Sequence, residues 1–493
     1  MTGTRRPGAA TQNVLVPPAE RGRCEAARSV GMETPEFESR GQRRTALVIA
    51  WCGEEPSRVG EAATVPTEPV LLGRGLANGL RFARQRPGET TDTGPLWRPR
   101  ISHRQLRVWQ AGEAVAVESV GLCPLLVDGQ RTRRALVPPG SVIHLEGQLV
   151  LLCVQRPTAI PPLVHWPPDA TRGFGEPDAV GLVGESPAMW ALRDRLAFVA
   201  RLLPHVLVSG ASGTGKELAA QAIHRLSERS DRPIVARNAA TIPATLVDAE
   251  LFGNVRDYPN AGMRERKGLI GEADGSTLLL DEVGELPADL QAHLLRVLDA
   301  GEYQRLGDST ARHAALRLIA ATNRDPTNLR EELLARLPLR IEVPPLGARL
   351  EDVPLLMRHL LAQAARENPS IGPALHRDWD GERAHPRLGP DLVEALLRHG
   401  WSTHVRELGA LLWAAIASSN GELALTDEVR SRLSLRTVPL DAPQPQRDDP
   451  TVEEIRAVLS ANGGNVSQAW RTLGLPSRYA LYRMLKRHGV SPR

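Results

Sequence analysis

A glycine-rich loop at residues 210–217 has the composition and spacing of a phosphate-binding loop. It lies between an apolar run typical of a buried strand, HVLVSG, and a helical run, ELAAQAIHRL. Glycines let backbone N–H groups turn toward a phosphate, and the N-terminus of the following helix adds partial positive charge. We therefore predict that this loop binds a nucleotide, ATP. The alternative is a glycine-rich turn from strand to helix that binds no ligand. The predicted binding residues are Gly210, Ala211, Ser212, Gly213, Thr214, Gly215, Lys216 and Glu217.

Lys216 is the residue of this loop that would reach the β- and γ-phosphates. The chain holds three lysines among 61 Lys and Arg residues, so arginine is its default basic residue. A compact ammonium suits a phosphate cradle better than a planar guanidinium does, which accounts for a lysine at this position. Glu217 stands where the general motif has Ser or Thr for Mg²⁺, which is a departure from that motif.

Two acids end a second apolar run, STLLLDE, at residues 276–282. Asp281 would hold Mg²⁺, directly or through water, and Glu282 would polarise the attacking water as a base. A third apolar run, LRLIAATN, ends in Asn323, which is placed to sense the γ-phosphate. Two acids beginning a loop are common in isolation, but a phosphate loop upstream favours the catalytic interpretation.

The elements that must position these residues alternate between apolar strands and helices, which predicts a mainly parallel α/β sheet. The chain is expected to be multidomain, and the length of 493 residues allows about three or four domains. The expected parts are a disordered segment (1–43), a β-sandwich (44–156), a linker (157–178), an α/β ATPase domain (179–345), a helical lid (346–432), a second linker (433–450) and an all-α unit (451–493).

Composition excludes several classes of protein. The chain is 42% hydrophobic and 24% charged, and we see no apolar run long enough to cross a bilayer, so no membrane partner is expected. Arginines near the N-terminus are not followed by an apolar segment, which argues against a secretory signal and for a cytoplasmic location. The four cysteines show no CxxC spacing, so neither a metal site nor a disulfide framework is indicated.

The region from about 181 to 425 resembles the AAA+ domain of bacterial enhancer-binding proteins, which activate the sigma-54 form of RNA polymerase. The resemblance rests on GASGTGKELAAQAIH, AELFGN, LLLDEVGELPADLQAHLLRVLDAGEYQRLG, LIAATNRD and VREL. Glu after the loop lysine is usual in that family, so Glu217 is no longer an anomaly. The resemblance also implies a ring, expected to be a hexamer.

The same resemblance implies roles for four further residues. Asn238 corresponds to a switch asparagine that hydrogen-bonds the catalytic glutamate, here Glu282. Arg330 and Arg336 correspond by their spacing to arginine fingers that act on a neighbouring subunit, although surface arginines are the plain alternative in this Arg-rich chain. Arg406 corresponds to the sensor II arginine of the lid.

One segment departs from the family. The sigma-54 contact loop reads GAFTGA in relatives, whereas residues 257–262 read DYPNAG in this chain. Pro259 would stiffen the tip of the loop, and Asp257 adds a negative charge. The segment between Asn323 and Arg330 is also short, and GNVREL is replaced by THVREL. These differences leave contact with sigma-54 open.

The β-rich N-terminal part resembles a forkhead-associated (FHA) domain. Gly73-Arg74 follows a strand, and Ser102 is expected to begin another. In that family an Arg and a Ser bind phosphothreonine, since a guanidinium fork and a hydroxyl suit phosphate oxygens. Gln105 stands where the family has His, so phosphopeptide binding and a scaffold that only carries protein contacts are both open.

The C-terminal unit is basic, with seven Lys and Arg against two Glu in residues 451–493. Charge alone allows either a nucleic-acid surface or a solvated helix face. The unit resembles a Fis-type helix-turn-helix, which implies binding to double-stranded DNA; a basic hairpin for dimerisation is the alternative. The expected base readers are Ser477, Arg478 and Tyr479, and the other expected DNA contacts are Tyr482, Arg483, Lys486 and Arg487.

Three functions compete at this point. The first is an AAA+ ATPase that regulates transcription, is switched by the N-terminal module and binds DNA through its tail. The second is a DNA-binding regulator that uses nucleotide only for assembly and does not remodel sigma-54. The third is a signalling adaptor that works mainly through the N-terminal module.

Overall fold

The computed structural model describes residues 43–434, apart from 77–78, 98, 244, 259 and 378–384, together with positions 456, 458, 459 and 485. The predictions for residues 1–42 and, apart from those four positions, for the C-terminal helix-turn-helix therefore lie outside the described residues.

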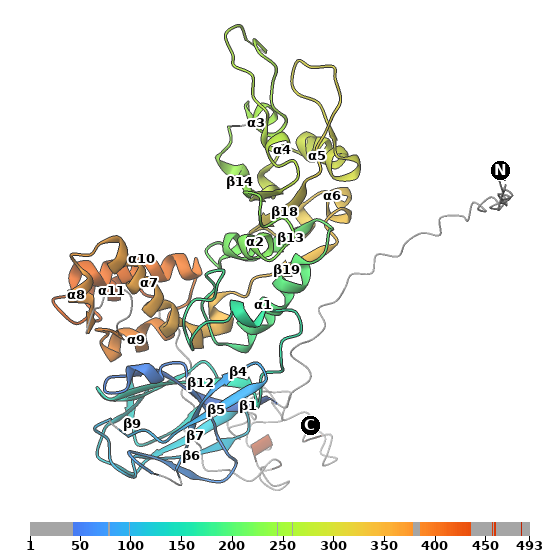
Figure 1. Cartoon of the computed structure of the whole chain (residues 1–493). Helices are drawn as coiled ribbons and strands as arrows, with labels where there is room; N and C mark the ends of the chain where they lie inside the picture. The colour runs from blue at the N-terminus through green and yellow to red at the C-terminus, as the bar shows by residue number, and fades with distance from the viewer. Residues whose placement is uncertain are drawn as a thin grey trace, which may run out of the picture. The chain divides into compact units, whose positions relative to one another are not determined.

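The N-terminal part contains two antiparallel sheets that enclose one core, as a β-sandwich requires (Figure 1). The larger sheet has the order β5-β4-β2-β1-β12-β11-β8-β9. The smaller sheet has the order β10-β7-β6-β3. The strands are β1 (Arg43–Cys52), β2 (Ala62–Thr64), β3 (Val70–Leu72), β4 (Phe82–Arg86), β5 (Glu89–Gly94), β6 (Leu106–Ala111), β7 (Ala114–Ser119), β8 (Leu125–Val127), β9 (Gln130–Thr132), β10 (Arg134–Val137), β11 (Val142–Leu145) and β12 (Leu149–Pro157), with the 3₁₀ turn η1 (Pro56–Arg58).

Strand β12 is buried on both faces. Leu149 and Leu151 point into the core between the two sheets, whereas Val150 and Leu152 point to the opposite face and join the core of the helical lid. Successive side chains of a strand alternate between its faces, so a strand covered on both sides must be apolar throughout. The uninterrupted run LVLLCV follows from this position.

Residues 157–178, expected to be a linker, pack against the central α/β domain. Trp166 and Ala170 are buried in the same core as helices α1 (Pro187–Ala200) and α2 (Lys216–Arg225). The turn η2 (Pro168–Ala170) lies within this segment. The proline-rich segment is therefore a connection that packs on the domain. Each proline fixes the backbone and has no N–H group that needs a partner.

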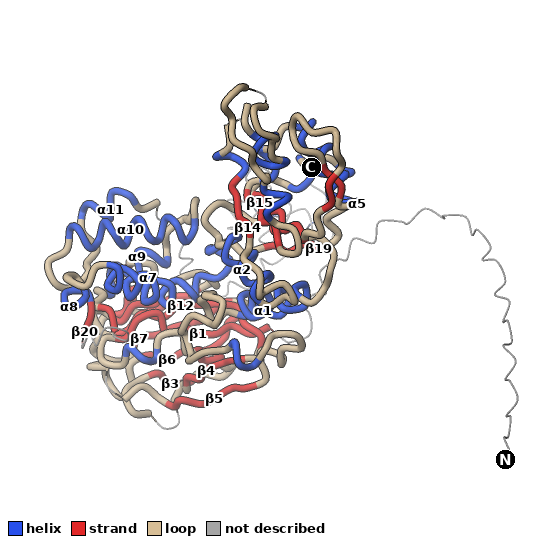
Figure 2. The backbone as a smooth tube through the Cα atoms, turned by 45° about the horizontal axis from the view of Figure 1, so that its top comes forward, coloured by secondary structure: helices blue, strands red, loops and turns tan. Residues whose placement is uncertain are grey.

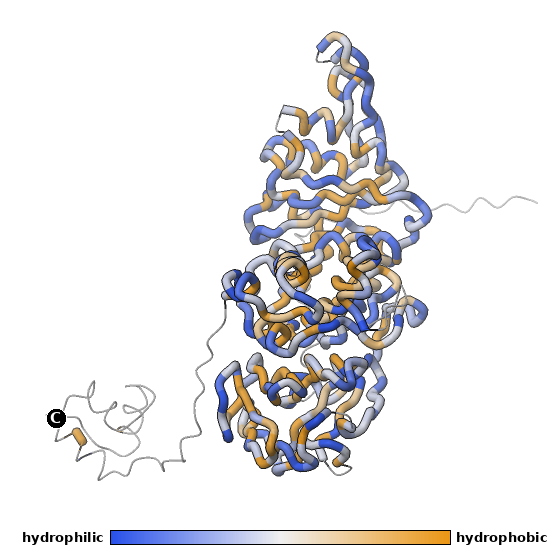
Figure 3. The backbone as a smooth tube through the Cα atoms, turned by 90° about the vertical axis from the view of Figure 1, so that its left-hand side faces the viewer, coloured by the Kyte–Doolittle hydropathy of each residue, from blue (hydrophilic) through white to orange (hydrophobic). Residues whose placement is uncertain are grey.

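The central domain contains a five-stranded sheet in which every pairing is parallel, with the order β14-β15-β18-β13-β19 (Figure 2). Helices α1 and α2 cover one face, and α3, α4, α5 and α6 cover the other. Strands β13, β15 and β18 are buried almost throughout, as two-sided burial requires, whereas the edge strands β14 and β19 are partly exposed. Figure 3 shows how hydrophobic and hydrophilic residues alternate along the backbone. The remaining bounds are β13 (Val206–Ser209), β14 (Val235–Asn238), η3 (Ala239–Thr241), α3 (Val247–Phe252), α4 (Leu269–Glu272), β15 (Thr277–Asp281), η4 (Val283–Glu285), α5 (Ala288–Ala300), β16 (Glu302–Tyr303), β17 (Arg312–His313), β18 (Arg317–Thr322), η5 (Pro326–Asn328), α6 (Glu331–Ala335) and β19 (Leu339–Glu342).

The lid follows β19 and is helical, as the periodicity of the sequence predicts. Its apolar core also takes in Ala50 and Val142 of the sandwich. Over the residues that the structure describes, no helix is long and apolar enough to cross a membrane. The lid elements are η6 (Leu346–Asp352), α7 (Val353–Glu367), α8 (Gly372–Leu375), β20 (His376–Arg377), β21 (His385–Pro386), α9 (Pro390–Leu397), α10 (His404–Ser418) and α11 (Asp427–Arg432).

Candidate nucleotide site

The phosphate loop joins β13 to α2 and has the backbone form that its glycines predict. Gly210, Gly213 and Gly215 have φ values of +149°, +79° and +105°. A Cβ atom on Gly213 would lie 2.1 Å from the carbonyl oxygen of Thr403, which belongs to the lid. Glycine is thus needed at position 213 both for the left-handed backbone and for the close approach of the lid.

Lys216 is buried at the first position of α2, and its side chain folds back over the loop. Its Nζ atom donates to the carbonyl oxygens of Gly210 and Ala211 at 3.0 and 3.3 Å. The same atom lies 3.8 Å from Oε1 of Glu282. The ammonium therefore sits between the loop and the end of β15, where a phosphate could exchange for the carbonyl contacts.

Asp281 ends β15, and the neighbouring strand β14 ends in Asn238 at the same register. Nδ2 of Asn238 donates to Oδ2 of Asp281 at 3.1 Å. The family resemblance implied a bond from Asn238 to Glu282, and the structure instead places this bond on Asp281. Parallel strands in register bring the two end residues together, whereas the backbone turns sharply at the next residue.

Glu282 makes that turn. It has φ +53° and ψ +46°, a left-handed conformation that few residues other than glycine adopt. Its Oε2 atom accepts a hydrogen bond from the backbone N–H of Asn323 at 3.1 Å. Backbone strain of this kind persists where the surrounding structure fixes it, and such residues cluster at active sites. Asn323 thus contacts the predicted base through its main chain.

A cavity of about 350 Å³ connects these residues. The phosphate loop, Asp281 and Glu282 form one part, and an apolar compartment forms the other. This compartment takes side chains from both sides of the domain boundary, with Leu182 and Met189 before and within α1, and Leu356 and His359 on α7. Burial lowers the pKa of His359, so its ring is neutral near pH 7. A phosphate end next to an apolar end fits a nucleotide.

Arg349 lines this cavity, and sequence reasoning missed it. Its side chain is buried, and Nη2 donates to the carbonyl oxygen of Thr214 at 3.0 Å. Burial lowers the pKa of Arg349, and the charge of Asp352 opposes that shift. The residue lies in the connection from the sheet to the lid, and it carries no motif that would mark it. The one feature of the sequence that could have pointed to Arg349 is its position shortly after the Pro-Pro pair that follows β19.

Arg406 brings the lid to the phosphate loop. Its Nη1 atom donates to Oγ of Ser212 at 2.9 Å, and the backbone N–H of Val405 donates to the carbonyl of Gly213. His404, at the start of α10, has φ +51°. The family has Asn at this place, and both His and Asn tolerate the left-handed region better than most residues. The replacement therefore keeps the geometry of the turn.

Glu407 fixes the start of α10. It accepts hydrogen bonds from the backbone N–H groups of Ser402 and Thr403 and from Nε2 of His399. Burial would raise the pKa of Glu407, but the bonds from Thr403, His399 and Ser402 outweigh it and lower this pKa to about 2. The carboxylate therefore fixes the backbone just before α10, and its negative charge in the first turn favours the helix N-terminus.

Arg330 and Arg336 flank α6 and lie outside the cavity of their own chain. Nε of Arg330 lies 3.5 Å from Glu332, and Arg336 pairs with Asp299. The side chains of Arg330 and Arg336 are 39% and 44% exposed. Both arginines are thus presented at the surface of the domain.

The segment corresponding to the sigma-54 contact loop is folded back on its own domain. Nδ2 of the buried Asn254 donates to the carbonyl oxygens of Val255, Tyr258 and Arg264. A Cβ atom on Gly307 would lie 2.6 Å from the ring of Tyr258, so the ring covers this glycine. Pro259 lies outside the described residues. Polar groups within the loop are hydrogen-bonded to one another. This folded arrangement could not be inferred from the absence of the GAFTGA motif.

Arg74 and Ser102 lie next to each other in the sandwich. The backbone N–H of Arg74 donates to the carbonyl of Ser102 at 3.1 Å, and Oγ of Ser102 accepts from the N–H of Leu122. Ser102 lies in the loop before β6, which begins at Leu106; the expectation that Ser102 begins the strand was wrong. Gln105 explains the difference, because its buried side chain bonds the N–H groups of Ser102 and Cys123 and holds the loop off the sheet.

The seven predicted DNA-contacting residues lie outside the described residues: Ser477, Arg478, Tyr479, Tyr482, Arg483, Lys486 and Arg487.

Comparison with known proteins supports the assignment of the α/β domain that carries the phosphate loop. The family described as Sigma-54 interaction domain matches residues 182–346. The transcriptional regulatory protein ZraR of Escherichia coli (strain K12) is 36% identical over 315 residues, covering 62% of this chain and 68% of ZraR. The Nif-specific regulatory protein of Azotobacter vinelandii is 36% identical over 317 residues, covering 62% of this chain and 58% of that protein.

Among solved structures, the crystal structure of NtrX from Brucella abortus in complex with ATP is similar with a TM-score of 0.44. It is 29% identical and covers 63% of this chain and 70% of NtrX.

Proposed function

Because this chain belongs to the family of sigma-54-interacting AAA+ transcriptional regulators, we propose that it is a ring-forming, DNA-binding regulator that hydrolyses ATP. The observation that carries the proposal is the meeting of four parts in one cavity. These are the phosphate loop with Lys216, the acids Asp281 and Glu282, the apolar compartment, and Arg406 from the lid. A binding site that only sensed nucleotide would need no base beside the phosphate end.

Each residue has a role that its position supports. The loop N–H groups and Lys216 bind the β- and γ-phosphates, and Arg406 adds positive charge from the lid. Glu282 orients a water for attack on the γ-phosphate and accepts its proton. Asp281 offers carboxylate oxygens, the ligands that Mg²⁺ prefers, and Asn238 orients that carboxylate. Bound Mg²⁺ would neutralise phosphate charge.

Arg330 and Arg336 support assembly into a ring. Each lies outside its own cavity with a partly exposed guanidinium, and each would exchange its present carboxylate partner for the phosphate in the site of a neighbouring subunit. An arginine supplied across an interface stabilises charge on the transferred phosphoryl group and couples hydrolysis to assembly. A head-to-tail contact of this kind closes into a ring when the rotation between subunits allows it.

The flanking parts supply recognition in this proposal. Arg74 and Ser102 would bind a phosphothreonine peptide: a backbone hydrogen bond holds the two residues next to each other, and a guanidinium and a hydroxyl suit phosphate oxygens. The tail at 451–493 would bind double-stranded DNA, with Arg478 reading bases and Lys486 contacting phosphate.

The contact loop favours a second candidate, a regulator that uses its nucleotide site without remodelling sigma-54. Tyr258 is held against Gly307, and Asp257 accepts from the N–H of Gly262, which closes the loop on itself. The sequence DYPNAG at residues 257–262 also places the charged Asp257 in a segment that reads GAFTGA in relatives. Such a protein would repress transcription or act on another form of polymerase.

A paired assay separates the two. The full chain should hydrolyse ATP, and Lys216→Ala should abolish hydrolysis while Lys267→Ala, a change at an exposed lysine, should not. Binding to sigma-54 is then measured with ADP and aluminium fluoride, which together imitate the transferred phosphoryl group. Binding supports the first candidate, and hydrolysis without binding supports the second. Absence of both nucleotide binding and hydrolysis would overturn the ATPase proposal.

A further inference from the structure

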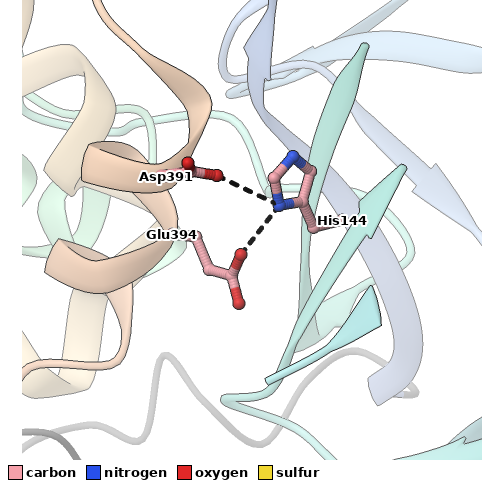
Figure 4. A group of neighbouring side chains, drawn as sticks. All are labelled: His144, Asp391 and Glu394. Atoms are coloured by element: carbon pink, nitrogen blue, oxygen red, sulfur yellow. Dashed lines mark hydrogen bonds and ion pairs between the residues drawn. The ribbon is translucent and has the colours of Figure 1, made fainter. Parts of the chain in front are cut away.

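The sandwich is bonded to the lid through buried polar contacts. Nδ1 of His144 on β11 contacts Oε2 of Glu394 on α9 at 2.8 Å, and both side chains are buried (Figure 4). Nε1 of Trp51 donates to the carbonyl oxygen of Leu388 at 2.7 Å. These bonds join residues about 250 to 340 positions apart in the chain.

His144, Asp391 and Glu394 are residue types that can bind a metal. Their hydrogen bonding instead indicates a polar contact between the sandwich and the lid. The backbone N–H of Gly147 donates to Nε2 of His144, so the ring proton lies on Nδ1 and is donated to Glu394. A metal on Nδ1 would need that nitrogen without its proton. Arg398 also lies 3.6 Å from Oε1 of Glu394 and already supplies positive charge.

Apolar packing makes this contact extensive. Val142, Val150 and Leu152 of the sandwich belong to the same core as Leu392 and Leu396 of α9. All five side chains are fully or almost fully buried. A continuous apolar core between two parts holds them as one packed unit.

The large sheet is also bonded to the α/β domain and to η6, through β4 and β12. Nη2 of Arg86 on β4 donates to Oε1 of Glu185 at 2.7 Å, and its guanidinium lies over the ring of Trp190 in α1. Glu185 also accepts from the backbone N–H of Gly175. Arg156 on β12 pairs with Glu351 in η6, the connection between sheet and lid.

These anchors lie on both sides of the nucleotide cavity. Glu185 follows the cavity residues Leu182 and Val183 after one glycine, and Glu394 belongs to the lid that supplies His359 and Arg406. The sandwich is therefore attached both to the fixed side of the cavity and to the side that must move. Opening and closing of such a lid commonly limit product release.

We propose that the N-terminal sandwich is a strap that holds the lid at a set angle to the α/β domain and slows release of the nucleotide product. The proposal rests on the nucleotide site proposed above. It assigns the large sheet of the sandwich, through β4, β11 and β12, a mechanical role that is separate from recognition at Arg74 and Ser102. Weakening either anchor should free the lid.

The test uses the full chain with one variant at each anchor. Arg86→Ala weakens the anchor to the α/β domain, and Glu394→Ala weakens the anchor to the lid. Glu394→Gln keeps an oxygen acceptor for His144 and should behave like the unmodified chain. Arg107→Ala is the matched arginine control, because Arg107 pairs with Glu118 in the smaller sheet. Circular dichroism checks that each variant is folded.

Two readouts follow lid motion. Hydrogen–deuterium exchange of α9 and α10 is measured without nucleotide, and release of a fluorescent ADP is measured by stopped flow. Both alanine variants at the anchors should exchange faster in the lid and release ADP about threefold faster or more, while the two controls should not. Folded anchor variants with unchanged or slower rates would overturn the strap.

A further measurement tests the proposal even if the variants fail to fold, because it uses only the unmodified chain. In the unmodified chain, ADP should change exchange at β4 and at residues 173–176 but leave β6 and β7 unchanged. Equal exchange with and without bound ADP at β4 would overturn the strap. If the chain binds no ADP, the nucleotide proposal fails, whereas lid exchange without nucleotide still decides the strap.

Discussion

Asn238 donates a hydrogen bond to Asp281 across the ends of two adjacent parallel strands, at 3.1 Å. The bond sets the direction of a carboxylate that faces the phosphate loop. The same asparagine accepts from the backbone N–H of Ala240 through Oδ1, so its amide is fixed at both ends. Asn238 thus couples the predicted Mg²⁺ ligand to the turn that follows β14.

Replacing Asn238 should impair hydrolysis more than nucleotide binding. Asn238→Ala leaves Asp281 free to rotate, and loss of such a supporting bond typically costs about 10- to 100-fold in activity or metal affinity. We expect a lower rate and a higher Mg²⁺ requirement, measured by ATPase assays over a Mg²⁺ series. Arg237→Ala, on the same strand, is the control. A variant with unchanged Mg²⁺ dependence would contradict the role.

Glu282 and Arg336 should complement each other between subunits. Glu282→Gln and Arg336→Ala are each expected to lower ATP turnover by about 100-fold or more. In a 1:1 mixture, about one quarter of the interfaces would pair an intact base with an intact neighbouring arginine, and activity should return accordingly. Arg340→Ala alone should stay active. A mixture as inactive as its components would show that Arg336 does not act on a neighbour.

The contact loop should become mobile when Tyr258 loses its ring. Tyr258→Ala removes the packing on Gly307, so trypsin should cut faster after Arg256 and Arg264 while ATP turnover stays unchanged. Tyr258→Phe keeps the ring and serves as the control. The measurement is the cleavage rate followed by mass spectrometry. Equal rates in all three chains would mean that the ring does not hold the loop.

Glu407 should stabilise the lid in a pH-dependent way. Its folded-state pKa of about 2 lies below the ordinary 4.5, so its contribution is complete above pH 4.5 and is lost as the pH falls toward 2. Glu407→Gln should lower the free energy of unfolding by about 1 kcal/mol at pH 7, a figure reduced for solvent screening.

The measurement for Glu407 is urea unfolding at pH 7 and near pH 3. The difference between Glu407→Gln and the unmodified chain should shrink at the lower pH. Glu422→Gln, a change at an exposed lid glutamate, should unfold like the unmodified chain at both values. A difference that is constant with pH would show that the charge of Glu407 is not the cause.

Much of the site follows from local patterns. The phosphate loop needs particular residues at adjacent positions, and the acids after an apolar strand have a fixed relation to it in any parallel sheet. The strand-helix alternation predicts the α/β domain, and the five-stranded parallel sheet confirms it. The β-runs of the first third predict a sandwich, which is also present.

Other parts could not be read from sequence because they depend on contacts between distant segments. Arg349 reaches Thr214 only because the segment that follows β19 folds against the phosphate loop. Whether Asn238 meets Asp281 or Glu282 depends on the strand register and on the left-handed turn at Glu282. The prolines of residues 157–178 suggested a linker, but Trp166 within them is buried.

The sequence by itself determined the chemistry of the phosphate loop and the order of the parts, since both depend on neighbouring residues and on short periodic patterns. Only the tertiary structure decided that His144 meets Glu394 and that Arg86 meets Glu185. Those pairs hold two parts of the chain together through buried hydrogen bonds. No local pattern specifies such a pair. Each side chain becomes buried and meets its partner only when both segments have folded.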